Sequence, residues 1–305
     1  MGAATARVEG GAAGAPPAGA FGPRPIPEVG DADFARYQAF VKREAGINLS
    51  PVKKALLVGR LSRRLRELSL GWRDYYELVQ TDEAERIRML DAIATNETHF
   101  FREPGHWELL AHEVLPRWQA DADAGKRPRR LRVWSAACST GEEPYTLAMV
   151  LLTSLPGWAI EILGTDLSTK VLDRSQRAVW PLEKSAEIPE AYRKAYMLRG
   201  VGEHEGLMRA GPELRALCTF RRLNLITGPL PEGDFDLVFC RNVLIYFDNE
   251  TKAGVIDRLV DHLAPGGRLF IGHAETLAGL STRVRPACPT VYVHAAEAGG
   301  KGGGR

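Results

Sequence analysis

The residues best suited to chemistry lie in one short stretch, WSAACSTGEEPYTLAM (134–149). The LRVW segment that leads into it is typical of a strand, and PYTLAMVLLTSL, with Pro144 near its first turn, is typical of a buried helix. Small residues and Gly141 at such a joint let a ligand approach the backbone closely. Because Glu142 and Glu143 would repel a phosphate, we expect a nucleoside that carries hydroxyls or a positive charge.

Acidic and amide side chains follow the later predicted strands. Asp166 comes 25 residues after Gly141, where a carboxylate can accept hydrogen bonds from both ribose hydroxyls or, alternatively, cap a helix. Asn224 and the CRN segment (240–242) occupy the ends of two further strands, and ligands of open α/β sheets bind at these ends. NAD and S-adenosylmethionine both fit. The absence of G-x-G-x-x-G and the presence of carboxylates favour S-adenosylmethionine, which has no phosphate and is cationic.

The elements that position these residues begin at about Leu131, where predicted strands alternate with helices. This rhythm indicates an α/β fold with a doubly wound, mostly parallel sheet. We expect a helix through TKVLDRSQRAVW (169–180) and a last strand in TVYVHAA (290–296), as an antiparallel edge. Residues 192–219 break the rhythm, and their glycines predict an inserted antiparallel β-subdomain of two or three short strands.

The chain before Leu131 divides into three predicted parts. Residues 1–30 are rich in Gly, Ala and Pro and are expected to form a disordered tail, as are residues 297–305. Residues 31–93 show helical periodicity and predict a small all-α domain, and residues 94–130 are expected to be a linker. The α/β domain would then span 131–296.

One predicted helix of the all-α domain has two distinct faces. Its apolar stripe, which we expect in the core, consists of Leu57, Val58, Leu61, Leu65 and Leu68. Lys53, Arg60 and Arg64 lie close together on a flank of that stripe. They form either a solvated basic face or a docking surface for an acidic helix or for nucleic acid.

Composition narrows the class of protein. The 305 residues carry a formal net charge of +2, so charge alone does not argue for nucleic acid. The apolar runs fall far short of the ~20 residues of a membrane helix, and the N-terminus lacks a signal-peptide core. Four widely spaced cysteines form no metal-ligand pair and predict free thiols in the cytoplasm. We expect no metal and no membrane insertion.

Five blocks together resemble the chemotaxis receptor methyltransferases, the CheR family: NETHFFRE, WSAACSTGEEPYTLAM, ILGTDLS, FDLVFCRNVLIYFD and GGRLFIGHAETL. The resemblance covers about residues 31–295, in order. It implies a helical N-terminal domain, a Rossmann-like S-adenosylmethionine-dependent methyltransferase domain and an inserted β-subdomain. The implied reaction moves a methyl group from S-adenosylmethionine to glutamate side chains of methyl-accepting receptors. The implied products are glutamate methyl esters and S-adenosylhomocysteine.

The resemblance also assigns roles to single residues. Arg102 and Tyr246 would act at the transferred methyl group or the substrate carboxylate. The implied cofactor-binding residues are Asn96, Thr98, Arg102, Glu143, Asp166, Asn224, Leu225, Arg241 and Asn242. A glutamate carboxylate is already ionised at neutral pH, because its reference pKa is about 4.3, so no general base is required. His273 is therefore expected to be structural, and His99 and His106 to be surface or linker residues.

The implied partner is the cytoplasmic domain of a methyl-accepting receptor, with Lys53, Arg60 and Arg64 as candidate docking residues. In some family members the insertion also binds a peptide at the receptor's C-terminus. Here Arg199 and Gly202 would serve that binding, unless the glycines only form turns. A nucleic-acid base methyltransferase is disfavoured because RNVLIYF lacks the prolines of the Asn/Asp-Pro-Pro-aromatic motif. A small-molecule substrate is disfavoured by the basic helix and the insertion. We expect a cytoplasmic monomer that binds no nucleic acid.

Overall fold

The computed structural model of the chain describes residues 28–296. Residues 1–27 of the predicted N-terminal tail (1–30) and all of the predicted C-terminal tail (297–305) lie outside the described residues. Val29, in the remainder of the N-terminal tail, is buried against the first helices. Among residues 28–296, no helix combines the length and the apolar character needed to span a bilayer.

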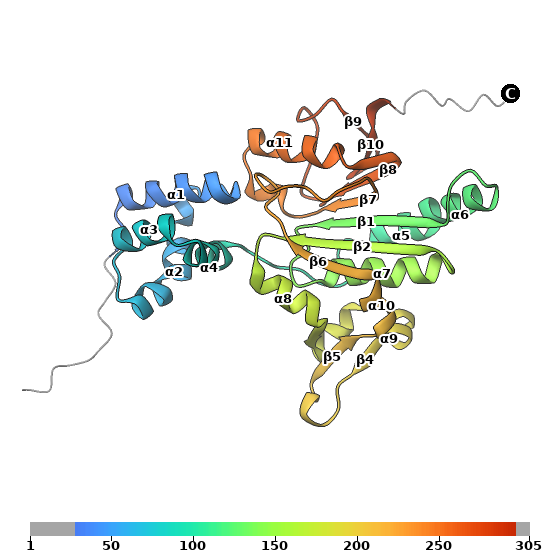
Figure 1. The fold of residues 1–305 in the computed structure, drawn as a ribbon, viewed down its shortest axis with the longest axis horizontal. Coiled ribbons are helices and arrows are strands. Elements are labelled where there is room, and N and C mark those ends of the chain that lie inside the picture. The colour runs from blue at the N-terminus through green and yellow to red at the C-terminus, as the bar shows by residue number, and fades with distance from the viewer. Residues whose placement is uncertain (1–27, 297–305) are drawn as a thin grey trace, which may run out of the picture.

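A small all-α domain opens the described chain and stands to one side of the sheet (Figure 1). Its elements are α1 (Asp31–Ala45), a 3-10 turn (Pro51–Lys53), α2 (Lys54–Leu68), α3 (Trp72–Thr81) and α4 (Glu83–Ile93). Leu57, Leu61 and Leu65 of α2 are fully buried, and Val58 and Leu68 pack at the margin of the same core. The predicted apolar stripe is therefore correct.

The main sheet has seven strands in the order β6-β2-β1-β7-β8-β10-β9. Its strands are β1 (Arg130–Ala136), β2 (Ala159–Asp166), β6 (Cys218–Arg222), β7 (Phe235–Cys240), β8 (Leu263–Ile271), β9 (Val284–Cys288) and β10 (Val291–His294). The first five in spatial order are parallel, whereas β10 runs antiparallel to both neighbours. The predicted doubly wound, mostly parallel sheet is confirmed. The prediction that the last strand forms the edge is wrong, because β9 lies outside β10.

Helices cover the sheet and bury its apolar face. They are α7 (Glu142–Ser154), α8 (Thr169–Arg177), α11 (Asn249–Val260), and the run α5 (Pro104–Leu109), a π-helical turn (Leu110–Val114) and α6 (Leu115–Asp123). The last run occupies the segment expected to be a linker. Trp107 from α5 stacks on Phe239 of β7 at a ring-centroid distance of 5.7 Å, so this segment belongs to the α/β core. The π turn ends two residues before Pro116, which lacks the N–H of a regular helix.

The inserted β-subdomain hangs below the main sheet in Figure 1 and starts earlier than expected. It contains β3 (Val179–Pro181), a 3-10 segment (Leu182–Glu187), α9 (Glu190–Tyr196), β4 (Met197–Arg199), a 3-10 turn (Gly202–His204), β5 (Leu207–Ala210) and α10 (Pro212–Leu217). The antiparallel order is β3-β5-β4. The helix predicted through residue 180 ends at Arg177, because Ala178 adopts a left-handed conformation (φ 53°) and turns the chain into β3. The predicted insertion, 192–219, thus missed its first strand, and its last two residues belong to β6.

Candidate active site

A cavity of about 220 Å³ lies at the carboxyl ends of β1, β2, β6 and β7, beneath the all-α domain. All nine predicted cofactor-binding residues line it, together with Tyr246 and Lys53: Asn96, Thr98, Arg102, Glu143, Asp166, Asn224, Leu225, Arg241 and Asn242. The prediction that these residues share one site is consistent with this placement. Their individual roles in binding and catalysis remain predictions.

The loop between β1 and α7 bends sharply into the cavity. Ala137 and Ser139 have positive φ angles of 67° and 49°, and Gly141 has 95°. Such conformations are costly for residues with a Cβ and cluster at functional sites. A Cβ on Gly141 would lie 3.1–3.2 Å from Ser175, so glycine also fits the space available. The loop is therefore held in a strained shape that exposes its backbone to a ligand.

The two adjacent carboxylates of this loop point in different directions. Glu143 lines the cavity and accepts hydrogen bonds from Ser135 Oγ (2.6 Å) and Arg241 Nη1 (2.9 Å). Glu142 is fully buried on the other side, where its oxygens contact Lys184 Nζ and Thr140 Oγ1, both at 2.6 Å. Only Glu143 can therefore act on a ligand, and the expectation that both carboxylates shape the site is wrong for Glu142.

Asp166 stands at the end of β2 and is tied to the same loop. Its two oxygens accept hydrogen bonds from the backbone N–H groups of Ser139 and Ser168, both at 2.9 Å. Burial raises the pKa of Asp166, and these two N–H groups oppose the shift. Because a carboxylate has about four acceptor positions, and the backbone N–H of Leu167 also contributes, Asp166 keeps capacity for a further donor. The helix cap of α8 is Ser168, whose hydroxyl accepts from Val171, so Asp166 is not needed for that role.

Asn224 and Leu225 follow β6 on the apolar side of the cavity. The amide nitrogen of Asn224 donates to Glu44 O in α1 at 2.5 Å, and its oxygen accepts from Ile226 N at 3.0 Å. Asn224 thereby joins the two domains at the cavity wall. Leu225 is buried beside Phe247 and supplies an apolar surface of the kind that a nucleobase packs on.

Arg241 is the electrostatic centre of the site. Its side chain is 1% exposed and contacts Glu143 (2.9 Å), Glu103 (3.0 Å) and the carbonyl oxygen of Arg102 (2.6 Å). Burial raises the pKa of Glu143, and the Arg241 charge opposes that rise. A buried cation between two carboxylates fixes the position of all three groups, because each would be costly to bury alone.

Glu103 is the residue that sequence reasoning missed. One of its oxygens pairs with Arg241, and the other accepts from Asn242 Nδ2 (3.2 Å) and from His273 N (3.0 Å). Burial raises its pKa, but the Arg241 charge and these hydrogen bonds outweigh burial and leave it lowered. Its left-handed backbone (φ 59°) starts α5. The only signal in the sequence was a carboxylate directly after Arg102.

Cationic side chains stand at the mouth of the cavity. Arg102 is half-buried and donates only to Glu97 O (3.1 Å) among the hydrogen bonds of the described residues. Lys53 Nζ lies 5.8 Å from the ring centre of Tyr246. An anionic substrate group would be attracted to this opening.

The other predicted docking residues lie away from the cavity. Arg60 contacts the carbonyl oxygens of Ala92 and Ala94 (3.3 and 3.4 Å), and Arg64 is bound to both oxygens of buried Glu85 (2.7 and 2.6 Å). Arg199 and Gly202 are exposed at the tip of the insertion.

Two histidines differ in environment. His273 is exposed, whereas His106, expected at the surface or in the linker, is only 3% exposed. The prediction for His106 is wrong because α5 packs its ring against Phe270 of β8.

Comparison with known proteins agrees with this architecture. Residues 32–94 match the family described as CheR methyltransferase, all-alpha domain, and residues 96–293 match CheR methyltransferase, SAM binding domain. The chain is 40% identical to chemotaxis protein methyltransferase 2 of Pseudomonas aeruginosa, over 85% of this chain and 92% of the relative. It is 37% identical to the chemotaxis protein methyltransferase of Escherichia coli, over 87% and 91%. The chain therefore belongs to the CheR family of S-adenosylmethionine-binding methyltransferases.

Proposed function

We propose that this enzyme transfers a methyl group from S-adenosylmethionine to glutamate side-chain carboxylates of methyl-accepting chemotaxis receptors in the cytoplasm. The products would be glutamate methyl esters and S-adenosylhomocysteine. The names of the relatives support the receptor as substrate. The observation that carries the proposal is a cavity with buried carboxylates inside and unneutralised cationic groups at its mouth.

The residues of the inner wall fit the cofactor. Asp166 has spare acceptor capacity for the ribose, and Leu225 offers an apolar face to adenine. The neighbouring charges of Arg241 and Glu143 match the zwitterionic amino-acid end of the cofactor, a carboxylate beside an ammonium. S-adenosylmethionine, when bound, supplies the electrophilic methyl group.

The residues of the mouth fit an anionic nucleophile. A glutamate carboxylate needs no deprotonation at neutral pH, so the enzyme's task is to orient one oxygen in line with the methyl group and to exclude water. Arg102 attracts and positions that carboxylate, and Tyr246 borders its path. Since Arg102 forms no ion pair within residues 28–296, its charge remains available to the substrate.

Methyl transfer from labelled S-adenosylmethionine to receptor-containing membranes tests the proposal. We expect label in the receptor that mild alkali releases as methanol, because a methyl ester is hydrolysed by base. Receptor in which the methylated glutamates are replaced by alanine is the matched control and should stay unlabelled. Alkali-stable label, or label in the control, would contradict glutamate as the acceptor.

A further inference from the structure

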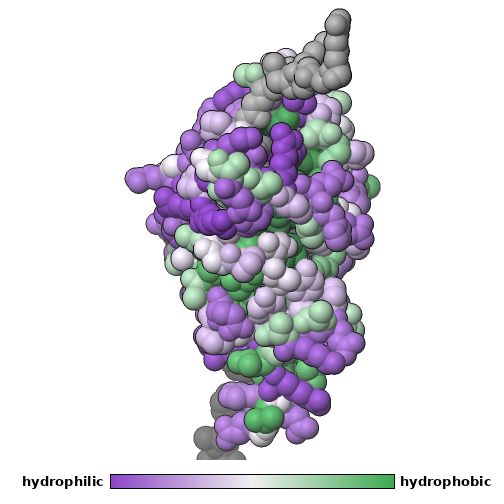
Figure 2. Space-filling view, turned by 90° about the vertical axis from the view of Figure 1, so that its right-hand side faces the viewer, coloured by the Kyte–Doolittle hydropathy of each residue, from purple (hydrophilic) through white to green (hydrophobic). Residues whose placement is uncertain are grey.

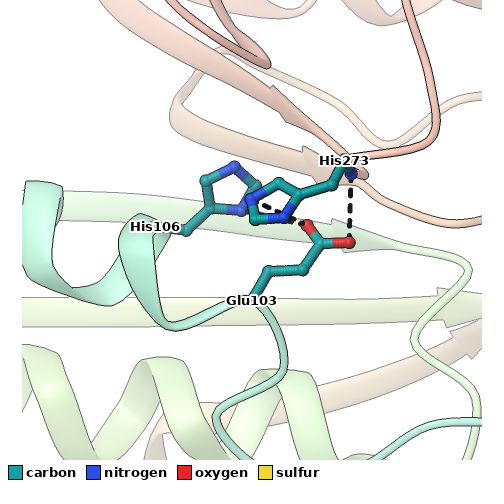
Figure 3. A group of neighbouring side chains, drawn as sticks. All are labelled: Glu103, His106 and His273. Atoms are coloured by element: carbon teal, nitrogen blue, oxygen red, sulfur yellow. Dashed lines mark hydrogen bonds and ion pairs between the residues drawn. The ribbon is translucent and has the colours of Figure 1, made fainter.

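One carboxylate and two imidazoles meet behind the cofactor cavity (Figure 3). Glu103 and His106 belong to the start of α5, and His273 follows β8. Glu103 Oε2 lies 3.5 Å from His106 Nδ1 and 3.8 Å from His273 Nε2. One potential ligand atom from each of the three residues lies within 4.8 Å of the other two.

The hydrogen bonds of His106 fix which ring nitrogen carries the proton. The Thr290 hydroxyl donates to Pro289 O (2.6 Å), so it must accept from His106 Nε2–H (2.7 Å). His106 Nδ1 is then an unprotonated acceptor, and it is buried with no hydrogen-bond partner. It faces Glu103 Oε2, which is also an acceptor. Two facing acceptors repel each other unless a cation lies between them.

A metal ion would satisfy both facing acceptors at once, the unpartnered Nδ1 of His106 and Oε2 of Glu103. Neutral imidazole is the form that binds metals, and Thr290 orients this ring as outer hydrogen-bond partners do in metal sites.

We propose that Glu103, His106 and His273 form a binding site for a divalent transition-metal ion of the Zn²⁺ type. The ligand atoms are Glu103 Oε2, His106 Nδ1 and His273 Nε2, and water completes the coordination. Imidazole and carboxylate are ligands that Zn²⁺ accepts, at about 2.0–2.2 Å. His273 must swing slightly inward to reach this distance. It is free to do so, because its side chain is 57% exposed and borders an open groove that admits the ion.

The site is coupled to the cofactor cavity through Glu103. The same oxygen that would bind the metal pairs with Arg241 at 3.0 Å, and the other oxygen holds Asn242. A metal ion would draw the negative charge of Glu103 away from Arg241 and place a second cation near it. Because the metal would change the charge and the contacts of Arg241, it would change the affinity for the cofactor, and the effect is reciprocal. No local sequence pattern indicates this site, because His273 is remote in the chain from the other two ligands. The metal would regulate cofactor binding and would take no part in methyl transfer.

Calorimetry on the untagged, EDTA-treated full chain tests the site, with Zn²⁺ as titrant and Co²⁺ as a spectroscopic probe. We expect one ion per chain with a Kd of about 10 μM or lower. His273→Ala should weaken binding at least about tenfold and abolish the visible absorption band of low-coordinate Co²⁺. His112→Ala, an exposed histidine of the same groove, is the matched control and should leave both unchanged.

Two outcomes would overturn the site: no binding up to about 1 mM metal, or equal affinity in the wild type and His273→Ala. The coupling is measured separately by titrating S-adenosylhomocysteine with and without saturating Zn²⁺. We expect Zn²⁺ to change the affinity about fivefold in the wild type and to have no effect in His273→Ala. Equal affinity with and without Zn²⁺ in the wild type would refute the coupling.

Discussion

At the scale of single residues, Asp166 is expected to bind the cofactor ribose, and it also holds the loop after β1 through Ser139 N. Asp166→Ala removes the expected acceptor of the ribose hydroxyls and also the partner of Ser139 N. Losing a charged hydrogen-bond partner costs about 1.5–3 kcal/mol, so calorimetry should show S-adenosylhomocysteine binding at least about tenfold more weakly. Asp173→Ala, on the exposed side of α8, is the control. Unchanged affinity in a folded Asp166→Ala protein would remove Asp166 from the site.

Substitution of Arg102 tests whether the mouth of the cavity positions the substrate, and it leaves the inner wall unchanged. Its side chain makes one hydrogen bond, to Glu97 O, so Arg102→Ala should change stability little. The variant should nevertheless lower kcat/KM for receptor methylation by about 10- to 100-fold, because it removes a charged positioning group. Arg102→Lys should recover part of the loss. Arg117, which is exposed on α6, provides the control, and Arg117→Ala should have no effect. Rates near the wild type in a labelled-methyl assay would contradict the role.

At the scale of elements, the contact between α2 and α4 depends on a buried ion pair that titrates. Hydrogen bonding from Arg64, opposed by burial and aided by Tyr75 and Arg88, lowers the pKa of Glu85 to about 2. A carboxylate whose pKa is lowered by folding stabilises the fold above its unfolded pKa, and the contribution is lost as pH falls.

We therefore expect Glu85→Gln to be less stable than the wild type by about 3 kcal/mol at pH 7. The difference should shrink as the pH falls from about 4.5 towards about 2. Urea unfolding at several pH values measures it, and Glu83→Gln, exposed on the same helix, is the matched control. A difference that stays constant across this range would show that the ion pair is not its cause.

The elements also show what sequence patterns can and cannot predict. The apolar stripe of α2 and the alternation of strands and helices could be predicted, because in each case many residues follow the same periodic pattern. The three-residue β3 is too short for such a signal, and only the left-handed Ala178 separates it from α8. Glu103 escaped notice because its partners Arg241 and His273 lie 138 and 170 positions away. The role of Glu103 depends on contacts with residues that are distant in the chain, and no local sequence pattern shows such contacts.

At the scale of the whole molecule, the all-α domain closes the cavity and carries basic residues, of which Lys53 lies at the cavity mouth and Arg60 farther away. The domains are joined by Asn48 N to Tyr246 O (2.8 Å) and by the Lys42–Asp248 ion pair (2.6 Å). Docking of an acidic receptor helix should therefore depend on Lys53 and Arg60. Arg64 is better left intact, because reversing its charge would break its bonds to Glu85.

We expect the Lys53→Glu, Arg60→Glu double variant to raise the KM for receptor at least about fivefold, an effect that salt should weaken. Affinity for S-adenosylhomocysteine should remain within about twofold of the wild type, since neither residue is among the predicted cofactor ligands. Arg63→Glu, exposed on α2, is the control. Receptor methylation at an unchanged KM would mean that the basic face is only solvated.

We propose the insertion as a second, separate contact with the receptor. Because β4 is the edge of its small sheet, an extended receptor C-terminal peptide could add to it as a further strand. Leu198 and Val201 are 52% and 79% exposed there, and Figure 2 shows hydrophobic atoms on the surface at this lower end of the molecule. Gly200 pairs with Leu207 of β5, so alternation along the ladder turns the N–H and C=O of Arg199 outward.

This geometry yields a test that distinguishes backbone pairing from charge. Arg199→Ala removes the guanidinium but keeps the outward N–H, whereas Arg199→Pro removes both. If the peptide adds as a strand, calorimetry with the receptor's C-terminal pentapeptide should show micromolar binding. Arg199→Ala should weaken it a few-fold and Arg199→Pro should abolish it. Gly202→Val should also impair binding, because Gly202 holds a left-handed conformation (φ 59°) that valine disfavours. Unchanged S-adenosylhomocysteine affinity in each variant shows that the main domain is intact. No binding by the wild type up to about 1 mM peptide would leave the glycines as turn formers and restrict receptor recognition to the cavity and the all-α domain.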